Sequence, residues 1–220
     1  MQDLPRSFAR FALVLLTALA VGSASAEPAA LSGGAATAAA KPTAAIDALH
    51  ANLLDVMKNA ETLGYAGREQ KLRTVIPKYF DVDEMARQSL GGQQWKAASE
   101  DARRRYLETF ERFMVANYAG RFDGFSGQSF ETLGEVPGPR ETVIVKSRLI
   151  DPTDKNIDLN YRMHQVGGGW KVIDVYLNGS VSELALRRSE FVSIVKRQNL
   201  DALLVALDAK IAKLAAGGES

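Results

Sequence analysis

The spacing of apolar residues changes twice along this chain, and these changes limit the fold more than any other feature. From residue 46 to residue 122, large apolar residues recur every three or four positions, as they do on one face of a helix. From 128 to 177 the pattern alternates with a period of two, which is typical of strands. Helical spacing returns over 182–214. Helices, then strands, then helices predict an α+β fold, with a sheet covered on one face by helices.

Capping residues, glycines and one proline divide the helical parts into separate helices. Ser99 is a favourable N-cap, because Glu100 and Asp101 follow it at the positive end of the helix dipole. Pro77 should end or kink its helix, because it has no N–H donor. The expected helices cover residues 46–64, 68–79, 81–90, 99–122, 182–197 and 199–214.

Turn-forming residues separate about four expected strands. The links contain Pro137-Gly138-Pro139, then Asp151-Pro152-Thr153-Asp154, then Gly167-Gly168-Gly169. Such short links favour an antiparallel meander. The expected strands cover residues 128–133, 142–150, 157–166 and 170–177.

Residues 1–26 have the features of a cleaved secretory signal peptide. Arg6 and Arg10 precede an apolar run over 11–21, and Ala24-Ser25-Ala26 matches the small-residue cleavage pattern. The apolar run is short for a membrane span, and an uncleaved anchor is the alternative. We therefore expect the protein to be exported.

The remainder divides into a linker and one domain. Residues 27–43 are rich in Ala, Gly and Pro and are expected to form a flexible linker. Residues 44–217 are long enough for a single domain with a sizeable core. The chain contains no cysteine, so neither a disulfide nor a lipid on an N-terminal cysteine is expected. The mature protein should therefore be a soluble monomer whose core holds it together.

The charge pattern argues against two classes of partner. The chain has 27 basic and 26 acidic residues, and removal of the expected signal peptide leaves them balanced. Without a basic excess, the sequence does not indicate nucleic-acid binding. Without a polybasic run, any contact with a membrane is expected to be transient.

The sequence contains no clear pattern for catalysis or metal binding. His50 and His164 are the two histidines and lie in different expected elements, whereas a metal site or a catalytic triad needs several groups that converge. Residues 124–128 resemble a nucleophile elbow, but they lack its last glycine and precede a strand. The aspartates between 151 and 158 do not have the spacing of an EF-hand loop. We expect no metal, no cofactor and no enzymatic activity.

Most candidate binding residues in this sequence are large and apolar. They recur on expected helices and on alternate positions of the expected strands, where ordinary core packing would also place them. Apolar ligand sites use the same residue types, so composition does not separate a filled core from a hollow one. The candidates to line an apolar site are Trp95, Phe110, Tyr118, Val143, Val145, Leu149, Leu159, Tyr161, Met163 and Val172.

Two adjacent arginines flank the apolar stripe of the helix expected over 182–197. At least one of Arg187 and Arg188 should therefore hold its guanidinium near the apolar face. Asp174, on the preceding strand, is a candidate partner for Arg188 in a structural salt bridge. The alternative role for the arginine is contact with a head-group phosphate, which suits its forked donors.

Several short motifs resemble those of one protein family. The longest is Gly169-Trp170-Lys171-Val172-Ile173-Asp174-Val175, which leads to Gly179-Ser180 and then to Arg188-Ser189-Glu190-Phe191. The others are Phe80-Asp81-Val82-Asp83-Glu84-Met85-Ala86-Arg87, Leu90-Gly91 with Trp95, Thr109-Phe110, Asn117-Tyr118 and Asp158-Leu159-Asn160-Tyr161-Arg162. In this order, and after a signal peptide, they resemble the MlaC, or toluene-tolerance, family of periplasmic lipid carriers.

The resemblance implies both a fold and a function. The fold would be an NTF2-like, cystatin-like twisted antiparallel sheet packed on a helical bundle, with an apolar cavity between them. The function would be to carry lipid acyl chains across the periplasm, between an inner-membrane ABC transporter complex and an outer-membrane lipoprotein complex. Neither a cofactor nor turnover is implied.

One part of the sequence departs from the phospholipid carriers. They tend to read Asn-Tyr-Arg-Ser-x-Phe where this chain has Leu186-Arg187-Arg188-Ser189-Glu190-Phe191. With residues 116–118 and 122–128, this segment looks closer to the HpnM subgroup, which is associated with hopanoid biosynthesis. The cargo is therefore a phospholipid or a hopanoid. A cargo-free adaptor that docks on membrane transport machinery is the second functional class, since fold alone does not decide function.

Overall fold

A computed structural model describes residues 41–217 of the chain. The expected signal peptide and all but the end of the expected linker lie outside the described residues. The elements are α1 (Pro42–Lys58), α2 (Ala60–Tyr79), α3 (Val82–Leu90), α4 (Gly92–Ala97), α5 (Glu100–Arg121), β1 (Ser129–Pro137), β2 (Val143–Ile150), β3 (Ile157–Val166), β4 (Gly169–Leu177), β5 (Val181–Ser182), α6 (Glu183–Arg197) and α7 (Leu200–Ala215). This order confirms the predicted α+β class.

The strands form one antiparallel sheet in chain order from β1 to β5, which confirms the predicted meander. About four strands were expected, and the two-residue β5 adds a short fifth. Tyr161 on β3 lies between Val145 on β2 and Val175 on β4. Alternate side chains of β2 and β3 are buried, because one face of the sheet is covered and side chains alternate between faces.

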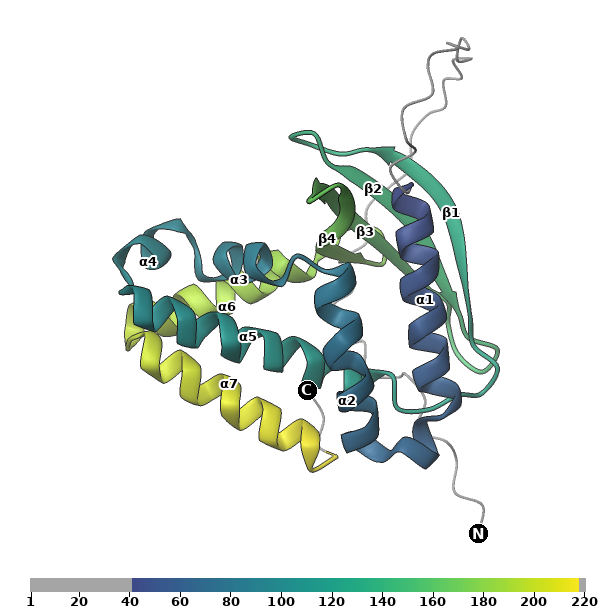
Figure 1. Ribbon diagram of the computed structural model, residues 1–220, viewed down its shortest axis with the longest axis horizontal. Helices are drawn as coiled ribbons and strands as arrows, with labels where there is room; N and C mark the ends of the chain where they lie inside the picture. The colour runs from purple at the N-terminus through teal and green to yellow at the C-terminus, as the bar shows by residue number, and fades with distance from the viewer. Residues whose placement is uncertain (1–40, 218–220) are drawn as a thin grey trace.

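The helices form a layer on the sheet and a bundle beside it. Figure 1 shows α1 lying across the sheet, with α2 next to it and α3, α5, α6 and α7 gathered on the far side of α2. Helix α1 packs against β1, β2 and β4, whereas α5 packs between α2 and α7. Helix α6 contacts both α3 and β4. No helix within residues 41–217 has both the length and the apolar character needed to cross a bilayer.

Side-chain caps begin four of the helices where the sequence has polar residues. Asp81, Ser99, Ser182 and Asn199 each accept a hydrogen bond from the backbone N–H three residues further on. Each cap satisfies one of the amides that the first turn of a helix leaves without an internal partner. The predicted starts of α3, α5, α6 and α7 are therefore confirmed within one or two residues.

The first part of the chain differs from the expectation. The helix expected over 46–64 divides at Asn59, and Gly64 has a left-handed φ of 56° inside α2. Glycine adopts this conformation at little cost, and here it breaks the helix into two parts. Pro77 lies two residues before the end of α2 at Tyr79, as expected for a proline that lacks the N–H needed to continue a helix. The short helix α4 was not expected.

Candidate ligand-binding site

A narrow, mostly apolar cavity lies between helix α5, the sheet and the start of α6. Its volume is about 50 Å³. The apolar lining residues are Phe80, Met85, Met114, Tyr118, Phe122, Leu149, Leu159, Tyr161, Val175 and Leu177, and the polar ones are Asn117, Arg121, Glu183 and Arg187. The apolar residues form the walls, and the polar residues come from α5 and from the first turns of α6.

Alternation along three strands provides the sheet wall. Leu159 and Tyr161 point to the same face of β3, because they are two residues apart. Their partners across the β3–β4 pair are Leu177 and Val175. Burial raises the pKa of Tyr161 well above its usual range, so this wall presents a neutral hydroxyl.

Helical spacing provides the opposite wall. Asn117 and Tyr118 lie three and four residues after Met114, and Arg121 lies four and three residues after those two, so all four share one face of α5. The Tyr118 ring meets the Phe80 ring edge-on at 5.3 Å between centroids. Burial raises the pKa of Tyr118 above its usual value, so it also remains neutral.

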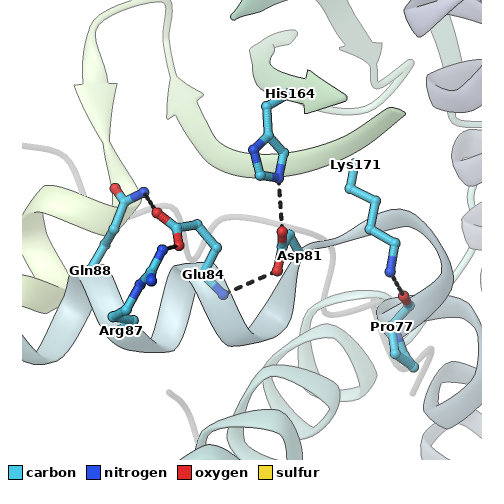
Figure 2. Close-up of polar contacts among 7 residues, drawn as sticks. All are labelled: Pro77, Asp81, Glu84, Arg87, Gln88, His164 and Lys171. Carbon is cyan, nitrogen blue, oxygen red and sulfur yellow. Dashed lines mark hydrogen bonds and ion pairs between the residues drawn. The ribbon is translucent and has the colours of Figure 1, made fainter. Parts of the chain in front are cut away.

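The corner between α2 and α3 is fastened to the hairpin between β3 and β4 (Figure 2). Asp81 accepts the N–H of Glu84 at 3.1 Å, and its other carboxylate oxygen lies 2.8 Å from Nε2 of His164. Lys171 donates from Nζ to the carbonyl oxygen of Pro77 at 3.0 Å. Because Phe80 adjoins Asp81, these contacts fix the position of one cavity wall.

Further contacts complete the same corner. The backbone N–H of Asp81 donates to the carbonyl oxygen of Val172 at 2.9 Å. Within α3, the carboxylate of Glu84 accepts from Gln88 at 2.6 Å and also pairs with Arg87 (Figure 2). The corner is thus held by side chains from two strands and one helix.

Three charged side chains stand at the polar end of the cavity. Nη2 of Arg187 and Nη2 of Arg121 lie 3.5 Å and 3.7 Å from the same oxygen, Oε2 of Glu183. The guanidinium of Arg187 also lies 5.0 Å from the ring centre of Phe113. Burial lowers the pKa of Arg187, while the nearby Glu183 carboxylate raises it. Arginine nevertheless stays protonated in proteins, so this end of the cavity is cationic.

A second hollow, of about 190 Å³, lies on the other side of these charges. It is a groove among α5, α6 and α7, lined by Phe113, Asn117, Arg121, Glu183, Leu186, Arg187, Glu190, Lys210 and Leu214. Asn117, Arg121, Glu183 and Arg187 line both hollows and therefore form a partition between them.

Four of the ten predicted apolar residues line the cavity: Tyr118, Leu149, Leu159 and Tyr161. The others lie in places that packing also requires. Phe110, Val145, Met163 and Val172 belong to the filled core and have no exposed surface. Val143 is partly buried at the start of β2, and Trp95 is partly buried under the guanidinium of Arg103.

The structure distinguishes the two adjacent arginines. Arg187 lines the cavity, with 16% of its side chain exposed, whereas Arg188 is exposed and does not line it. Asp174 is buried and does not pair with Arg188, which corrects the expected salt bridge. Its carboxylate accepts hydrogen bonds from the Ser182 hydroxyl at 2.7 Å and from the Leu184 N–H at 3.2 Å. Asp174 therefore fastens the start of α6 to β4.

Sequence reasoning missed several lining residues. Met114, Asn117 and Arg121 carry a signal, since they share a helical face with the predicted Tyr118. Val175 is buried and Leu177 is partly buried on β4, and both look like ordinary core residues. Within residues 41–217, no group of three or more His, Cys, Asp or Glu side chains could hold a metal ion.

Comparison with known proteins supports a family assignment. A profile of the MlaC protein family matches residues 47–209. Among solved structures, the fold is similar to that of a phospholipid-binding protein from Ralstonia solanacearum in complex with a phospholipid. The TM-score is 0.67 at 21% sequence identity, over 80% of this chain and 99% of the other. No curated protein matches the sequence at a significant level.

Proposed function

This chain belongs to the MlaC protein family, and we propose that it is a periplasmic protein that binds a lipid and carries it between the inner and outer membranes. It meets an ABC transporter complex at the inner membrane and a lipoprotein complex at the outer membrane. The carrier works as a monomer, touches each membrane transiently, and needs no cofactor or catalytic group.

The cavity is the observation that supports this proposal most. Its walls are large apolar side chains from α5, the α2–α3 corner and three strands, and charged groups stand at one end. An amphiphile has the same arrangement, with an apolar body and a polar head. Each methylene that leaves water for such a cavity stabilises the complex by about 0.8 kcal/mol, so a long acyl chain can bind tightly.

The cavity must widen as a lipid enters, because its volume of about 50 Å³ is too small for an acyl chain. Pockets for small molecules usually measure about 300–1,000 Å³. Met85 and Met114 offer unbranched, flexible side chains that can move aside. The walls also come from separate elements without a covalent cross-link, since the chain contains no cysteine.

The cargo is a phospholipid or a hopanoid. The Ralstonia solanacearum protein, which shares this fold, was solved with a phospholipid. The resemblance of residues 186–191 to the HpnM subgroup favours a hopanoid. Organic extraction of the purified mature protein, followed by mass spectrometry of the extract, distinguishes the two.

The second functional class is a cargo-free adaptor. A solid core and a large exposed apolar patch would favour that class. The apolar hollow between α5 and the sheet favours the carrier instead. The adaptor therefore serves as the alternative outcome of the experiment below.

Native mass spectrometry after incubation with lipid vesicles tests the proposal. We expect the wild-type protein to carry lipid, and a Leu177→Glu variant to fold as a monomer without lipid. Leu177 lines the cavity and is partly exposed, so a carboxylate there disfavours an acyl chain more than it disfavours folding. The matched control is Val166→Glu, at an exposed position near the end of β3, which should leave lipid binding unchanged.

Two outcomes would contradict the proposal. A wild-type protein that neither co-purifies with lipid nor takes it up from vesicles would favour the adaptor. A folded Leu177→Glu variant with full lipid occupancy would place the lipid somewhere other than this cavity.

A further inference from the structure

The partition between the two hollows places charged side chains beside an apolar cavity, which packing alone does not explain. On the inner side is the apolar cavity, and on the outer side is the groove among α5, α6 and α7. Arg187 has access to both, because it lines both hollows. A group bound at Arg187 would therefore lie where an apolar body in the cavity meets a polar head in the groove.

We propose that Arg187 binds the phosphate group of a lipid cargo at this partition, and that the Glu183 carboxylate takes the place of that phosphate when no lipid is bound. This inference rests on the proposed carrier function and adds the class of head group. It distinguishes a phosphate-bearing lipid from a neutral polycyclic one.

The geometry of the charged contacts supports an exchangeable carboxylate. Charge-assisted hydrogen bonds between an arginine and a carboxylate usually measure about 2.7–2.9 Å and are often bidentate. Here the two guanidiniums approach a single oxygen of Glu183, at 3.5 Å and 3.7 Å. A loose contact of this kind costs little to break, and the carboxylate can turn into the outer groove.

The charges around the partition favour an incoming anion. The outer groove is lined by three cations, Arg121, Arg187 and Lys210, and by two carboxylates, Glu183 and Glu190. Lys210 and Glu190 already form a 2.5 Å ion pair with each other. Beside that pair, the charged residues of the lining are one carboxylate, Glu183, and the two guanidiniums that approach it.

Arg187 is better placed for this role than an exposed arginine. It is largely buried and packs over the Phe113 ring, so its guanidinium has restricted freedom and little water around it. A phosphate offers several oxygens to the planar fork of an arginine, which lysine cannot match. A neutral lipid in the cavity would leave this buried cation without an additional partner.

The test compares two lipids that differ only in the phosphate. Dioleoylphosphatidate and dioleoylglycerol are presented to the full mature protein in the same nonionic detergent micelles, and the ratio of their affinities is measured. We expect the wild type to prefer phosphatidate. Arg187→Gln should lower that preference about tenfold or more, as expected for the loss of a charged hydrogen bond. Glu183→Gln should raise it, because the competing carboxylate is gone.

The adjacent arginine provides a matched control. Arg188 is exposed and lines neither hollow, so Arg188→Gln should leave the preference unchanged. A wild type that binds neither lipid would refute the carrier function itself. A wild type without preference, or an Arg187→Gln variant that loses both lipids equally, would refute the phosphate site while the carrier function stands.

A phosphate titration and the Glu183→Gln variant separate the remaining outcomes. Calorimetric titration of the lipid-free protein with inorganic phosphate tests whether the free ion is the ligand. Arg187-dependent binding of inorganic phosphate that displaces phosphatidate would overturn the assignment to a lipid head group. If Arg187→Gln does not fold, Glu183→Gln decides the matter, and an unchanged preference in that variant would overturn the proposal.

Discussion

At the scale of single residues, the cavity wall depends on a buried histidine. His50 on α1 stacks on the Phe130 ring, with 4.1 Å between centroids, and its Nε2 lies 3.2 Å from the hydroxyl of Tyr161. Burial lowers the pKa of His50 from 6.5 to about 4, although the nearby Asp47 carboxylate acts in the opposite direction. The neutral imidazole of His50 therefore supports Tyr161, whose side chain lines the cavity.

This burial predicts a loss of stability in mild acid. The unfolded chain takes up a proton at His50 near pH 6.5, whereas the folded protein does so only near pH 4. The stability that the fold has while His50 is neutral is fully present above pH 6.5. It is lost as the pH falls towards 4, because the unfolded state then binds more protons than the folded state. Between pH 7.5 and 4.5 we expect this residue to account for a loss of about 2–3 kcal/mol.

Urea unfolding of the wild type and of His50→Gln at both pH values measures this contribution. The glutamine does not titrate, so the free energy of unfolding should depend less on pH in the variant. Other groups titrate in both proteins and cancel in the comparison. Equal pH dependence would show that His50 is not held neutral by the fold.

A second prediction at this scale concerns the stability cost of truncating a residue in the cavity wall, compared with a residue in the filled core. Leu159 and Met163 share one face of β3, but Leu159 lines the cavity, whereas Met163 is completely buried in the core. Truncation of a packed residue leaves an unfilled space and typically costs about 2–5 kcal/mol. We expect Met163→Ala to fall in that range and Leu159→Ala to cost less than about 2 kcal/mol, because fewer atoms lose partners. Equal losses in urea unfolding of the lipid-free protein would mean that Leu159 packs as ordinary core.

At the scale of elements, α3 and α6 pack against each other, and both contribute residues to the cavity lining. The turn between α3 and α4 makes this contact possible. Gly91 there has a left-handed φ of 81°, and a Cβ at this position would lie 3.1 Å from Cγ2 of Val192 on α6. Gly92, the next residue, has open space around its Cα.

These neighbouring glycines give a matched pair of substitutions. Gly91→Ala should lower the free energy of unfolding by about 1–3 kcal/mol, because it adds backbone strain and crowds Val192. Gly92→Ala should be neutral or stabilising by up to about 1 kcal/mol, because alanine suits the first turn of α4 better than glycine. Denaturant titration of both variants tests this, and similar effects would contradict the role of the Gly91 conformation.

Most elements could be predicted from the sequence, because caps, glycines and periodicity act over a few neighbouring residues. The caps at Ser99 and Asn199 and the Gly167-Gly168-Gly169 turn are examples. The short α4 and β5 were missed because six and two residues show no period. The division of the first helix at Asn59 was also missed, whereas the break at Gly64 lies where that helix was expected to end.

The site was less predictable, because it depends on small differences in how elements meet. Leu159 and Met163 are both large apolar residues on one face of β3, and only the tertiary packing around them makes one a cavity wall. Arg187 and Arg188 differ by one step, or about 100° of rotation around α6. Local sequence limited the choice to these two arginines, while the tertiary position of α6 decided between them.

At the scale of the whole molecule, we expect a lipid that spans both hollows to move one layer relative to another. The partition residues come from α5 and from the start of α6, so we expect these two helices to separate there. Helix α7 packs mainly on α5 and contacts α6 less. We therefore expect α7 to stay with α5 while the start of α6 moves.

An engineered disulfide between α5 and α7 tests this division of the molecule. A Cβ on Gly120 would lie 4.0 Å from Cβ of Leu214, which is within the usual range for a disulfide of about 3.5–4.5 Å. The chain contains no other cysteine, so a Gly120→Cys, Leu214→Cys variant can form only this pair within one molecule. The bond would close a loop of roughly 100 residues, for which about 2–4 kcal/mol of stabilisation is typical.

We expect the oxidised variant to unfold at a higher temperature than its reduced form and to take up lipid from vesicles equally well. The reduced form of the same variant is the control, because it contains the same loss of Leu214 packing. If α7 moves with α5, the cross-link does not restrict the separation of α5 from the start of α6. Lipid uptake that stops on oxidation and returns on reduction would show instead that α5 and α7 must part for the lipid to enter.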